Sequence, residues 1–446
     1  MRNAGDPAMR LFEKCYAFLV ISSVSGVIGR IFGGHGALSS GGASFVSGGD
    51  RDPILLAFNL AVALATVALA VLKLPAMILL LRNFAWLVVL YTFGALSMAW
   101  SVDRATTFRS IVYLLVYGIA AANLALRFEP EALVWLIGKT MAALAALSAA
   151  GQLLLPPLSY GGGEWAGVFL HKDGLGVAMA VGVVSLLAVD RPWTLLRGFE
   201  LLLCAALLVL SGAAGAYLWA LAGLSTLLFL HVRRHLRLLM SLAVASALLV
   251  PPLVVPDFVS FATGLLGKDA SFTGRTEVWA IAVRMIAVRP WLGYGEGAFW
   301  STSSQTVGSL LGNWQPQHAH NGGLEICLNL GLVGLVLVLS TLADALRKMR
   351  IVGTEAGAHM RPWCAAVFVV LLVHAVDEAA FLQVSCLWFM FLLSSFALWV
   401  AERTSAAQAV CENAWDGNAA GPEMAPDGVA RTWSGEKTRC EESPSC

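Results

Sequence analysis

Long apolar stretches recur along most of the chain and are separated by short polar segments. Twelve of these windows approach the ~20 residues that a helix needs to cross ~30 Å of hydrocarbon. They lie at residues 13–32, 54–72, 84–100, 107–126, 132–154, 174–190, 194–211, 214–231, 237–255, 324–345, 363–382 and 385–401. Because a bilayer offers no water to backbone polar groups, this pattern predicts an all-α, polytopic integral membrane protein with about 12 transmembrane helices.

Positive charges in the short loops predict the orientation, because cytoplasmic loops retain Lys and Arg. The clusters are Arg2, Arg10 and Lys14; Lys73 and Arg82; Arg191 and Arg197; Arg233, Arg234 and Arg237; and Arg347, Lys348 and Arg350. All of them fall on one side of an alternating topology. We therefore expect both termini in the cytoplasm. The first window, which Arg30 interrupts, also has features of a signal-peptide core, but the later loops fit twelve spans with this window retained.

The windows divide the chain into four predicted parts. Residues 1–255 form an N-terminal membrane bundle of about nine spans, and residues 256–323 form one large external loop. Residues 324–403 contain the C-terminal spans. Residues 404–446 are rich in Ala, Gly, Ser, Glu and Pro without periodicity, which predicts a disordered cytoplasmic tail.

Composition narrows the class of protein. Of the 446 residues, 58% are hydrophobic and 13% are charged, well below the roughly 25% charged residues of a soluble domain. A net charge of +1 excludes a basic nucleic-acid binder. The eight cysteines have no CxxC spacing, and five of them lie in apolar runs. A disulfide scaffold and a thiolate zinc site are therefore disfavoured, and we interpret the apolar cysteines as small buried side chains.

The external loop contains an amphipathic helix, predicted at residues 276–288. Its apolar stripe consists of Val278, Trp279, Ala282, Met285 and Ile286, which recur at helical spacing. Arg284 falls opposite this stripe, whereas Arg275 lies at its N-terminal edge on the buried side. Because a buried cation is costly, Arg275 needs a partner more than Arg284 does.

A glycine-rich run follows Arg289 and reads Trp291-Leu-Gly-Tyr-Gly-Glu-Gly297. No P-loop lysine follows it and no strand precedes it, so a soluble nucleotide site is disfavoured. Its glycines permit tight turns and close backbone approach. The tryptophans of the loop either anchor it at the lipid headgroups or stack on sugar rings; these are Trp279, Trp291, Trp300 and Trp314.

The densest chemistry lies just before the tenth window, where the chain reads His318-Ala-His-Asn-Gly-Gly-Leu-Glu325. Asn321 can cap the following helix, whose free backbone N–H groups then face outward and can hold an anion. His320 is suited to general-base catalysis, although a structural role remains an alternative. Two His at i and i+2 with a Glu do not match a zinc-helix pattern, so we expect no metal.

A second polar segment lies on the same external side. His171, Lys172 and Asp173 open the helix of the sixth window and can contribute a cation to an anion site, with an ordinary solvated turn as the alternative. Charges within other windows occur at Lys139, Glu200, Asp377 and Glu378. Several lie close enough to window ends to snorkel, so we assign them no role.

Together these stretches resemble the O-antigen ligase and polymerase superfamily, particularly its exopolysaccharide polymerases of the succinoglycan type. The matching segments are Gly167-Val-Phe-Leu-His171-Lys-Asp-Gly-Leu-Gly176, Gly274-Arg-Thr-Glu-Val-Trp279, Arg289-Pro-Trp-Leu-Gly-Tyr-Gly-Glu-Gly-Ala-Phe-Trp300 and His318-Ala-His-Asn-Gly-Gly-Leu-Glu325. Family members also carry a spaced His, Asn and glycine pattern that His320, Asn321, Gly331 and Gly334 satisfy. The resemblance covers about residues 165–335.

The resemblance implies a GT-C-like glycosyltransferase of the bacterial inner membrane. It would polymerise undecaprenyl-pyrophosphate-linked oligosaccharide repeat units into an exopolysaccharide or O-antigen at the periplasmic face. The reaction inverts the anomeric centre in a single displacement and needs no metal or other cofactor. Alternatives are an O-antigen ligase that transfers glycan to a lipid A core, and a non-enzymatic lipid-glycan transporter or scaffold. Expected partners are the lipid-linked oligosaccharide, a glycan acceptor, the lipid bilayer and, further, chain-length regulator and export proteins; nucleic acid is not among them.

Residue roles follow from the same resemblance. His320 matches the essential loop His of the family, and Arg275 matches a loop Arg thought to engage the pyrophosphate. The family also tends to carry an Arg at the start of its eighth span, where this chain reads Leu210-Ser-Gly-Ala-Ala-Gly-Ala216. Lys172, Arg284 and Arg289 are the candidates to replace it. The residues we expect to bind other parts of the substrate are His171, Trp291, Tyr294, His318, Asn321 and Glu325.

Overall fold

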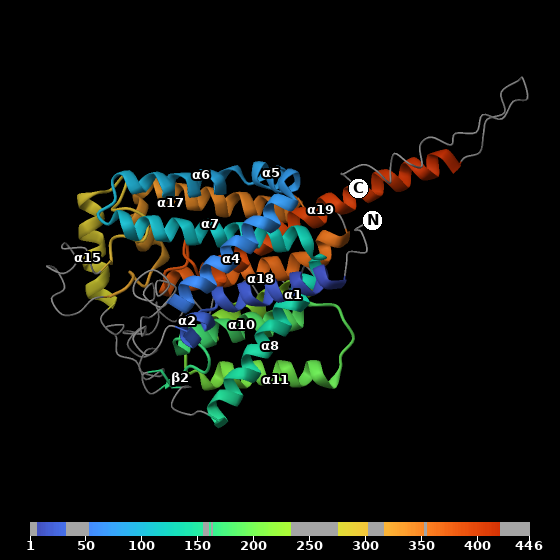
Figure 1. Ribbon diagram of the computed structural model, residues 1–446, viewed down its shortest axis with the longest axis horizontal. Coiled ribbons are helices and arrows are strands. Elements are labelled where there is room, and N and C mark those ends of the chain that lie inside the picture. The colour runs from blue at the N-terminus through green and yellow to red at the C-terminus, as the bar shows by residue number, and fades with distance from the viewer. Residues whose placement is uncertain are drawn as a thin grey trace, which may run out of the picture.

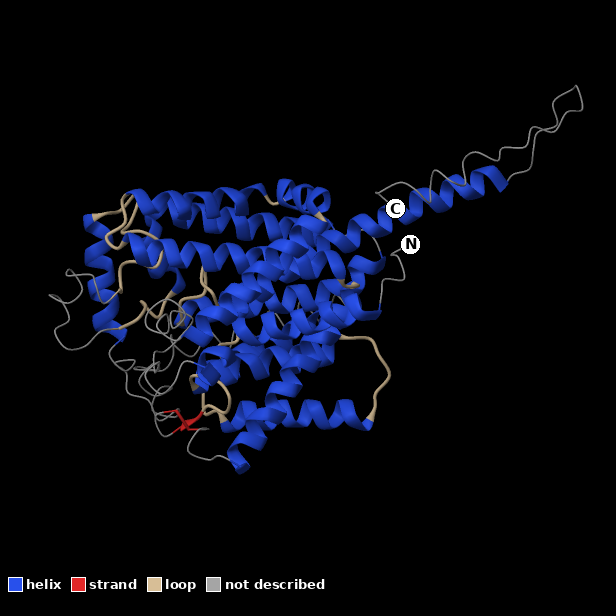
Figure 2. Ribbon diagram, viewed as in Figure 1, coloured by secondary structure: helices blue, strands red, loops and turns tan. Residues whose placement is uncertain are grey.

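The computed structural model describes residues 7–32, 53–154, 160–161, 164–232, 275–301, 316–351 and 355–419. The helices before the external segment are α1 (Pro7–Val24), α2 (Val27–Phe32), α4 (Pro53–Leu72), α5 (Leu74–Asn83), α6 (Ala85–Leu96), the short 3₁₀ turn η2 (Ser97–Ala99), α7 (Arg104–Arg127), α8 (Pro130–Leu154), α10 (Lys172–Ala188), α11 (Leu195–Leu210) and α12 (Ala214–His231). The later helices are α15 (Arg275–Val288), α17 (Gly322–Ile351), α18 (Glu355–Asp377) and α19 (Cys386–Ala419). Within the described residues, the strands are β1 (Tyr160–Gly161) and β2 (Glu164–Trp165), which pair antiparallel (Figure 2).

The helices agree with the predicted class of a polytopic membrane protein. Within the described ranges, six are long and apolar enough to cross a membrane, namely α4, α7, α8, α17, α18 and α19. The pair α5 and α6 forms a seventh candidate, bent by 94°. Eleven of the twelve apolar windows overlap described helices, while window 237–255 lies outside the described residues. The count of twelve spans therefore stays a prediction.

The helices pack side by side into a bundle. In Figure 1, α6, α17 and α7 run alongside one another, α15 crosses one end of the bundle, and α19 projects from the opposite end. Helix α19 packs against both α7 and α18 and is the most buried of the six candidate spans. The helix continues to Ala419, so the predicted disorder from residue 404 is wrong as far as Ala419. Residues 420–446 lie outside the described part.

Helix α15 has nearly the predicted bounds. Its stripe packs against the N-terminal part of α17 and the chain that leads to it, and Val278 and Ala282 are almost fully buried there. Arg284 lies on the exposed face, as expected from its position opposite the stripe. The apolar periodicity therefore determines which side of α15 faces the bundle.

Helix α17 is interrupted at Gly331, which has φ 67° and ψ −167°. The glycine-rich run packs into this interruption. Four backbone hydrogen bonds connect the two segments. Two run from the glycine-rich run to α17, from Tyr294 N–H to Leu328 O (2.8 Å) and from Gly295 N–H to Asn329 O (2.9 Å). Two run the other way, from Leu332 N–H to Pro290 O (2.8 Å) and from Val333 N–H to Trp291 O (3.4 Å). A Cβ on residue 331 would overlap the carbonyl of Trp291, so only glycine fits both the backbone angles and the space. The break in α17 thereby anchors the glycine-rich run that follows α15.

Candidate active site

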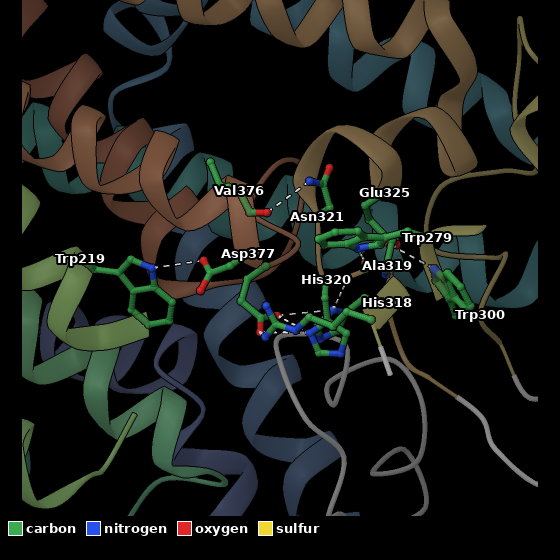
Figure 3. A network of polar contacts seen from close by, with 12 residues as sticks. Trp219, Trp279, Trp300, His318, Ala319, His320, Asn321, Glu325, Val376 and Asp377 are labelled. Carbon is green, nitrogen blue, oxygen red and sulfur yellow. Dashed lines mark hydrogen bonds and ion pairs between the residues drawn. The ribbon is translucent and has the colours of Figure 1, made fainter. Parts of the chain in front are cut away.

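A short loop before α17 carries His318 and His320. Asn321 caps the helix as predicted: its Oδ1 accepts the N–H of Leu324 at 3.0 Å. Its side-chain amide also donates to the carbonyl of Val376 at 3.2 Å, which ties the loop to the end of α18 (Figure 3). His320 adopts φ 47°, a left-handed conformation that is uncommon for a residue other than glycine. The cap therefore helps hold the backbone that positions this imidazole.

Glu325 holds the same loop from the other side. Its Oε2 accepts the N–H of Ala319 at 2.7 Å and the indole N–H of Trp300 at 3.0 Å. Trp279 of α15 donates to the carbonyl of Ala319 at 2.9 Å, so the backbone between the two His is fixed at both its N–H and its C=O. Glu325 is only 3% exposed and lines no described cavity. The expectation that it contacts substrate is therefore replaced by a structural role.

The carboxylate of Glu378, immediately after α18, lies at the centre of the site. His320 Nδ1 lies 3.1 and 3.2 Å from its two oxygens, and Arg275 Nη2 lies 3.2 Å from Oε1. His318 Nδ1 is 3.5 Å from Oε2. Burial by itself raises the pKa of Glu378, but the hydrogen bond with His320 and the positive neighbours outweigh it and lower this pKa to about 2. Glu378 is therefore ionised at neutral pH and gives Arg275 the partner that its position required.

The hydrogen bonds assign opposite tautomers to the two imidazoles. An ionised Glu378 can only accept, so His320 donates from Nδ1, and in the neutral ring Nε2 then carries the lone pair. Burial lowers the pKa of His318 to about 4, so this ring is neutral at neutral pH. The Nδ1 of His318 accepts the backbone N–H of His320 at 3.3 Å, which places the His318 proton on Nε2. One ring thus offers a base and the other a hydrogen-bond donor, with ring centres 4.1 Å apart.

A cavity of about 150 Å³ opens beside these rings. His318, His320 and Glu378 line one part of it, while His171, Asp173 and His374 line another. Apolar residues complete the wall, among them Val24, Leu170, Val177, Val384 and Leu387. The site therefore combines a lone-pair nitrogen, a carboxylate and an apolar surface within one enclosure.

The structure brings some of the predicted residues together. Arg275 meets His320 through their shared partner Glu378. His171 immediately precedes α10 and lines the cavity, and Lys172 is the first residue of that helix, as expected. Lys172 is not among the described residues that line the cavity, and its role in binding the pyrophosphate stays a prediction.

Other predicted residues lie away from the cavity. Arg284 and Arg289 are exposed, and the guanidinium of Arg289 lies 4.9 Å from the ring centre of Tyr294. Tyr294 is 3% exposed and donates its hydroxyl to the carbonyl of Met285 at 3.0 Å, so it holds the glycine-rich run rather than a sugar. Trp291 is 66% exposed on the outside of this run. These four residues do not contribute to the described cavity, because the run turns back onto α15 and α17.

Two residues with evident roles in this geometry had no role in the sequence interpretation. In the sequence, Glu378 is only an ionisable residue near the end of an apolar window. A charged side chain at such a position can extend to the membrane surface, so the sequence alone assigns no role to it. His374 lies four residues earlier, on the same helix α18. Helical spacing between these two residues was the available signal, since i and i+4 positions share a face.

The ligand atoms of His318, His320 and Glu378 lie within 4.8 Å of one another, close enough to hold a divalent cation. Their electron pairs are already engaged, however. Glu378 pairs with Arg275, and His318 Nδ1 accepts a backbone N–H. A metal would have to displace both interactions, so the donor set fits a protein-only network better.

Comparison with known proteins finds similarity over a region that contains part of this site. Residues 199–339 match the family model described as O-antigen ligase, a region that includes Arg275 and the His318–Glu325 segment. The chain is also similar to the exopolysaccharide production protein ExoQ of Rhizobium meliloti (strain 1021), at 24% identity over 284 residues. That alignment covers 59% of this chain and 64% of the relative.

The resemblance to the O-antigen ligase and polymerase superfamily is therefore confirmed. Within that superfamily, the chain is similar to a protein of exopolysaccharide production. Several helices long and apolar enough to span a membrane, together with this similarity, indicate a multi-pass membrane protein. His171, Lys172, His374 and Glu378 lie outside the matched family region.

Proposed function

We propose that this protein polymerises undecaprenyl-pyrophosphate-linked oligosaccharide repeat units at the periplasmic face of the bacterial inner membrane, with both of its termini in the cytoplasm. The observation that carries the proposal is the arrangement of His320 and Arg275 on one ionised carboxylate, Glu378, beside a cavity. This arrangement supplies the two tasks of the reaction, which are deprotonation of an acceptor hydroxyl and stabilisation of a diphosphate leaving group.

In the proposed reaction, the acceptor hydroxyl attacks the anomeric carbon of the donor from the side opposite the diphosphate. A carbon–oxygen bond forms to the acceptor, and the bond from the anomeric carbon to the diphosphate oxygen breaks with inversion. The hydroxyl proton moves to Nε2 of His320, whose ring Glu378 orients through Nδ1. The lipid diphosphate leaves with the bonding electron pair.

Arg275 is suited to bind that diphosphate. One of its amino groups contacts Glu378, which leaves other N–H groups of the planar guanidinium for phosphate oxygens. Its side chain is 24% exposed, so an anion can reach it. Charge-assisted bonds of this kind contribute roughly 1.5 to 3 kcal/mol each.

The test uses purified protein in lipid nanodiscs and a purified lipid-linked repeat unit. Product length and released lipid diphosphate are measured over time. Replacement of His320 by Ala should lower the rate by roughly 10²- to 10⁴-fold, the usual contribution of a positioned base. His359, an exposed His near the start of α18, provides a matched control when replaced by Ala. Wild-type rates from the His320→Ala protein would exclude the base assignment.

Ligation to a lipid A core is the second candidate, because the matching family model describes an O-antigen ligase. The same chemistry applies with a different acceptor. Adding a lipid A core together with the lipid-linked repeat unit distinguishes the two: a polymerase makes longer lipid-linked chains, whereas a ligase moves glycan to the core.

A further inference from the structure

His374 on α18 has a buried nitrogen without a hydrogen-bond partner. The residue is 8% exposed and lines the cavity, and its ring packs edge-on against Trp219, with centres 4.4 Å apart. No described residue forms a hydrogen bond with its Nδ1. Leaving such an atom unpaired costs free energy comparable to a lost hydrogen bond, which a ligand hydroxyl could restore.

His171 repeats this feature on a different element. It immediately precedes α10 and lines the same cavity, and its Nε2 is buried without a hydrogen-bond partner in the described ranges. Neither imidazole takes part in the proposed proton transfer or in diphosphate binding. Two histidines, one preceding α10 and one on α18, therefore line the cavity that His320 also lines, and each has a buried ring nitrogen without a hydrogen-bond partner among the described residues.

The charges around the cavity indicate what kind of ligand fits. Its described lining includes the acidic side chains Asp173 and Glu378 but no Lys or Arg. Arg275 is not among the lining residues and contacts Glu378. A diphosphate inside the cavity would meet two carboxylates and, among the described lining residues, no Lys or Arg side chain. A neutral ligand with several hydroxyl groups fits better, because it can both donate to and accept from imidazole nitrogens.

The size and apolar wall of the cavity agree with a sugar ring. Its volume of about 150 Å³ is roughly ten times the ~10–15 Å³ that holds a single water. Leu170, Val177 and Val384 provide apolar surface beside the imidazoles. A pyranose ring matches this combination of apolar and polar surface, because its C–H groups are apolar and its hydroxyl groups are polar.

We propose that this cavity binds the terminal sugar of the glycan acceptor, with His374 and His171 forming hydrogen bonds to its hydroxyl groups. The proposal rests on the proposed function and deepens it, because it separates the two substrates. The acceptor sugar lies inside the cavity next to His320, and the donor diphosphate lies at Arg275, on the outer side of Glu378.

The experiment measures binding without turnover. The free oligosaccharide of the host's repeat unit, released from its lipid and carrying no phosphate, is titrated into purified full-length protein in nanodiscs by calorimetry. His374→Ala and His171→Ala should each weaken binding by about tenfold. His374→Gln and His171→Gln test the same nitrogens with less change in volume. His359→Ala is the control for loss of an imidazole elsewhere and should bind as the wild type does.

Inorganic pyrophosphate provides the opposing test. The proposal expects pyrophosphate to leave oligosaccharide binding unchanged. Displacement of the oligosaccharide by pyrophosphate, or the absence of saturable oligosaccharide binding, would each overturn the proposal. Because no catalysis is required, this result is independent of the His320→Ala rate measurement, so failure of the proposed function can be distinguished from failure of this subsite.

Discussion

Replacing Glu378 by Gln tests the centre of the site with little change in shape. The carboxylate orients His320 and pairs with Arg275, and a Gln amide keeps its size but loses its charge. The pKa of Glu378, lowered from 4.5 to about 2, corresponds to roughly 3 kcal/mol in favour of the ionised form. The network therefore depends on this negative charge.

The expected effect on catalysis comes from the tautomer of His320. A Gln amide can donate to Nδ1, which would shift the ring proton to Nε2 and remove the lone pair that accepts the hydroxyl proton. Glu378→Gln should therefore lower the polymerisation rate by about 10²- to 10⁴-fold. Initial rates of lipid diphosphate release measure this effect in nanodiscs.

Glu131→Gln is the matched control, because Glu131 also forms an ion pair, with Arg191 at 2.8 Å, but is 55% exposed and far along the chain from the site residues. It should retain the wild-type rate. A Glu378→Gln protein whose rate stays within about twofold of the wild type would refute the orienting role, since a positioned base contributes far more than that.

The same pKa predicts how stability depends on pH. The pKa of Glu378 is lower in the folded protein than its ordinary value of 4.5, so the stabilisation is fully present above 4.5 and is lost as the pH falls towards 2. The difference in thermal stability between the wild type and Glu378→Gln should be constant from about pH 5 to 8, because this range lies above both pKa values of Glu378. The difference should shrink below about pH 4.5. A difference that instead changes across neutral pH would contradict an ionised Glu378.

Three further substitutions test the supports of the site. Gly331→Ala should destabilise the protein by roughly 1–3 kcal/mol or more, because alanine is strained at the positive φ of this position, and it should lower the unfolding temperature in detergent. Gly198→Ala is the control and should not, because a Cβ at Gly198 would meet no atom within 4 Å. Arg275→Ala should slow glycan extension at least about tenfold through loss of a charge-assisted bond, while exposed Arg284→Ala should leave it unchanged in the same assay. Glu325→Ala leaves the backbone N–H of Ala319 and the indole N–H of Trp300 unpaired, at about 1–3 kcal/mol each, so it should lower both thermal stability and rate.

Much of the local structure follows from the sequence alone. Apolar runs and helical spacing predict helices close to those observed, including the bounds and buried stripe of α15. Asn321, which can cap a helix, predicts the start of α17 at Gly322. These features depend on neighbours within about one helical turn, so the pattern of residue types is sufficient to specify them.

The sequence could not distinguish a functional charge from a structural one. Lys139, Glu200 and Glu378 all appear as ionisable residues within apolar windows. In the structure, Lys139 and Glu200 pair with each other at 2.6 Å, whereas Glu378 lies between Arg275 and His320. The role of each of these charged residues is decided by the residue it pairs with, and this pairing depends on which helices pack together.

Tertiary packing alone assembles the site. Glu378 is 58 residues from His320 and 103 from Arg275, and His374 and His171 reach one cavity from different helices. The glycine-rich run and Gly331 are likewise separate motifs in the chain that the fold joins. The sequence by itself determined the helices and the chemical groups they carry, because these depend on nearby residues. The tertiary structure decided which groups meet, because contacts between distant segments require the packing of the whole bundle.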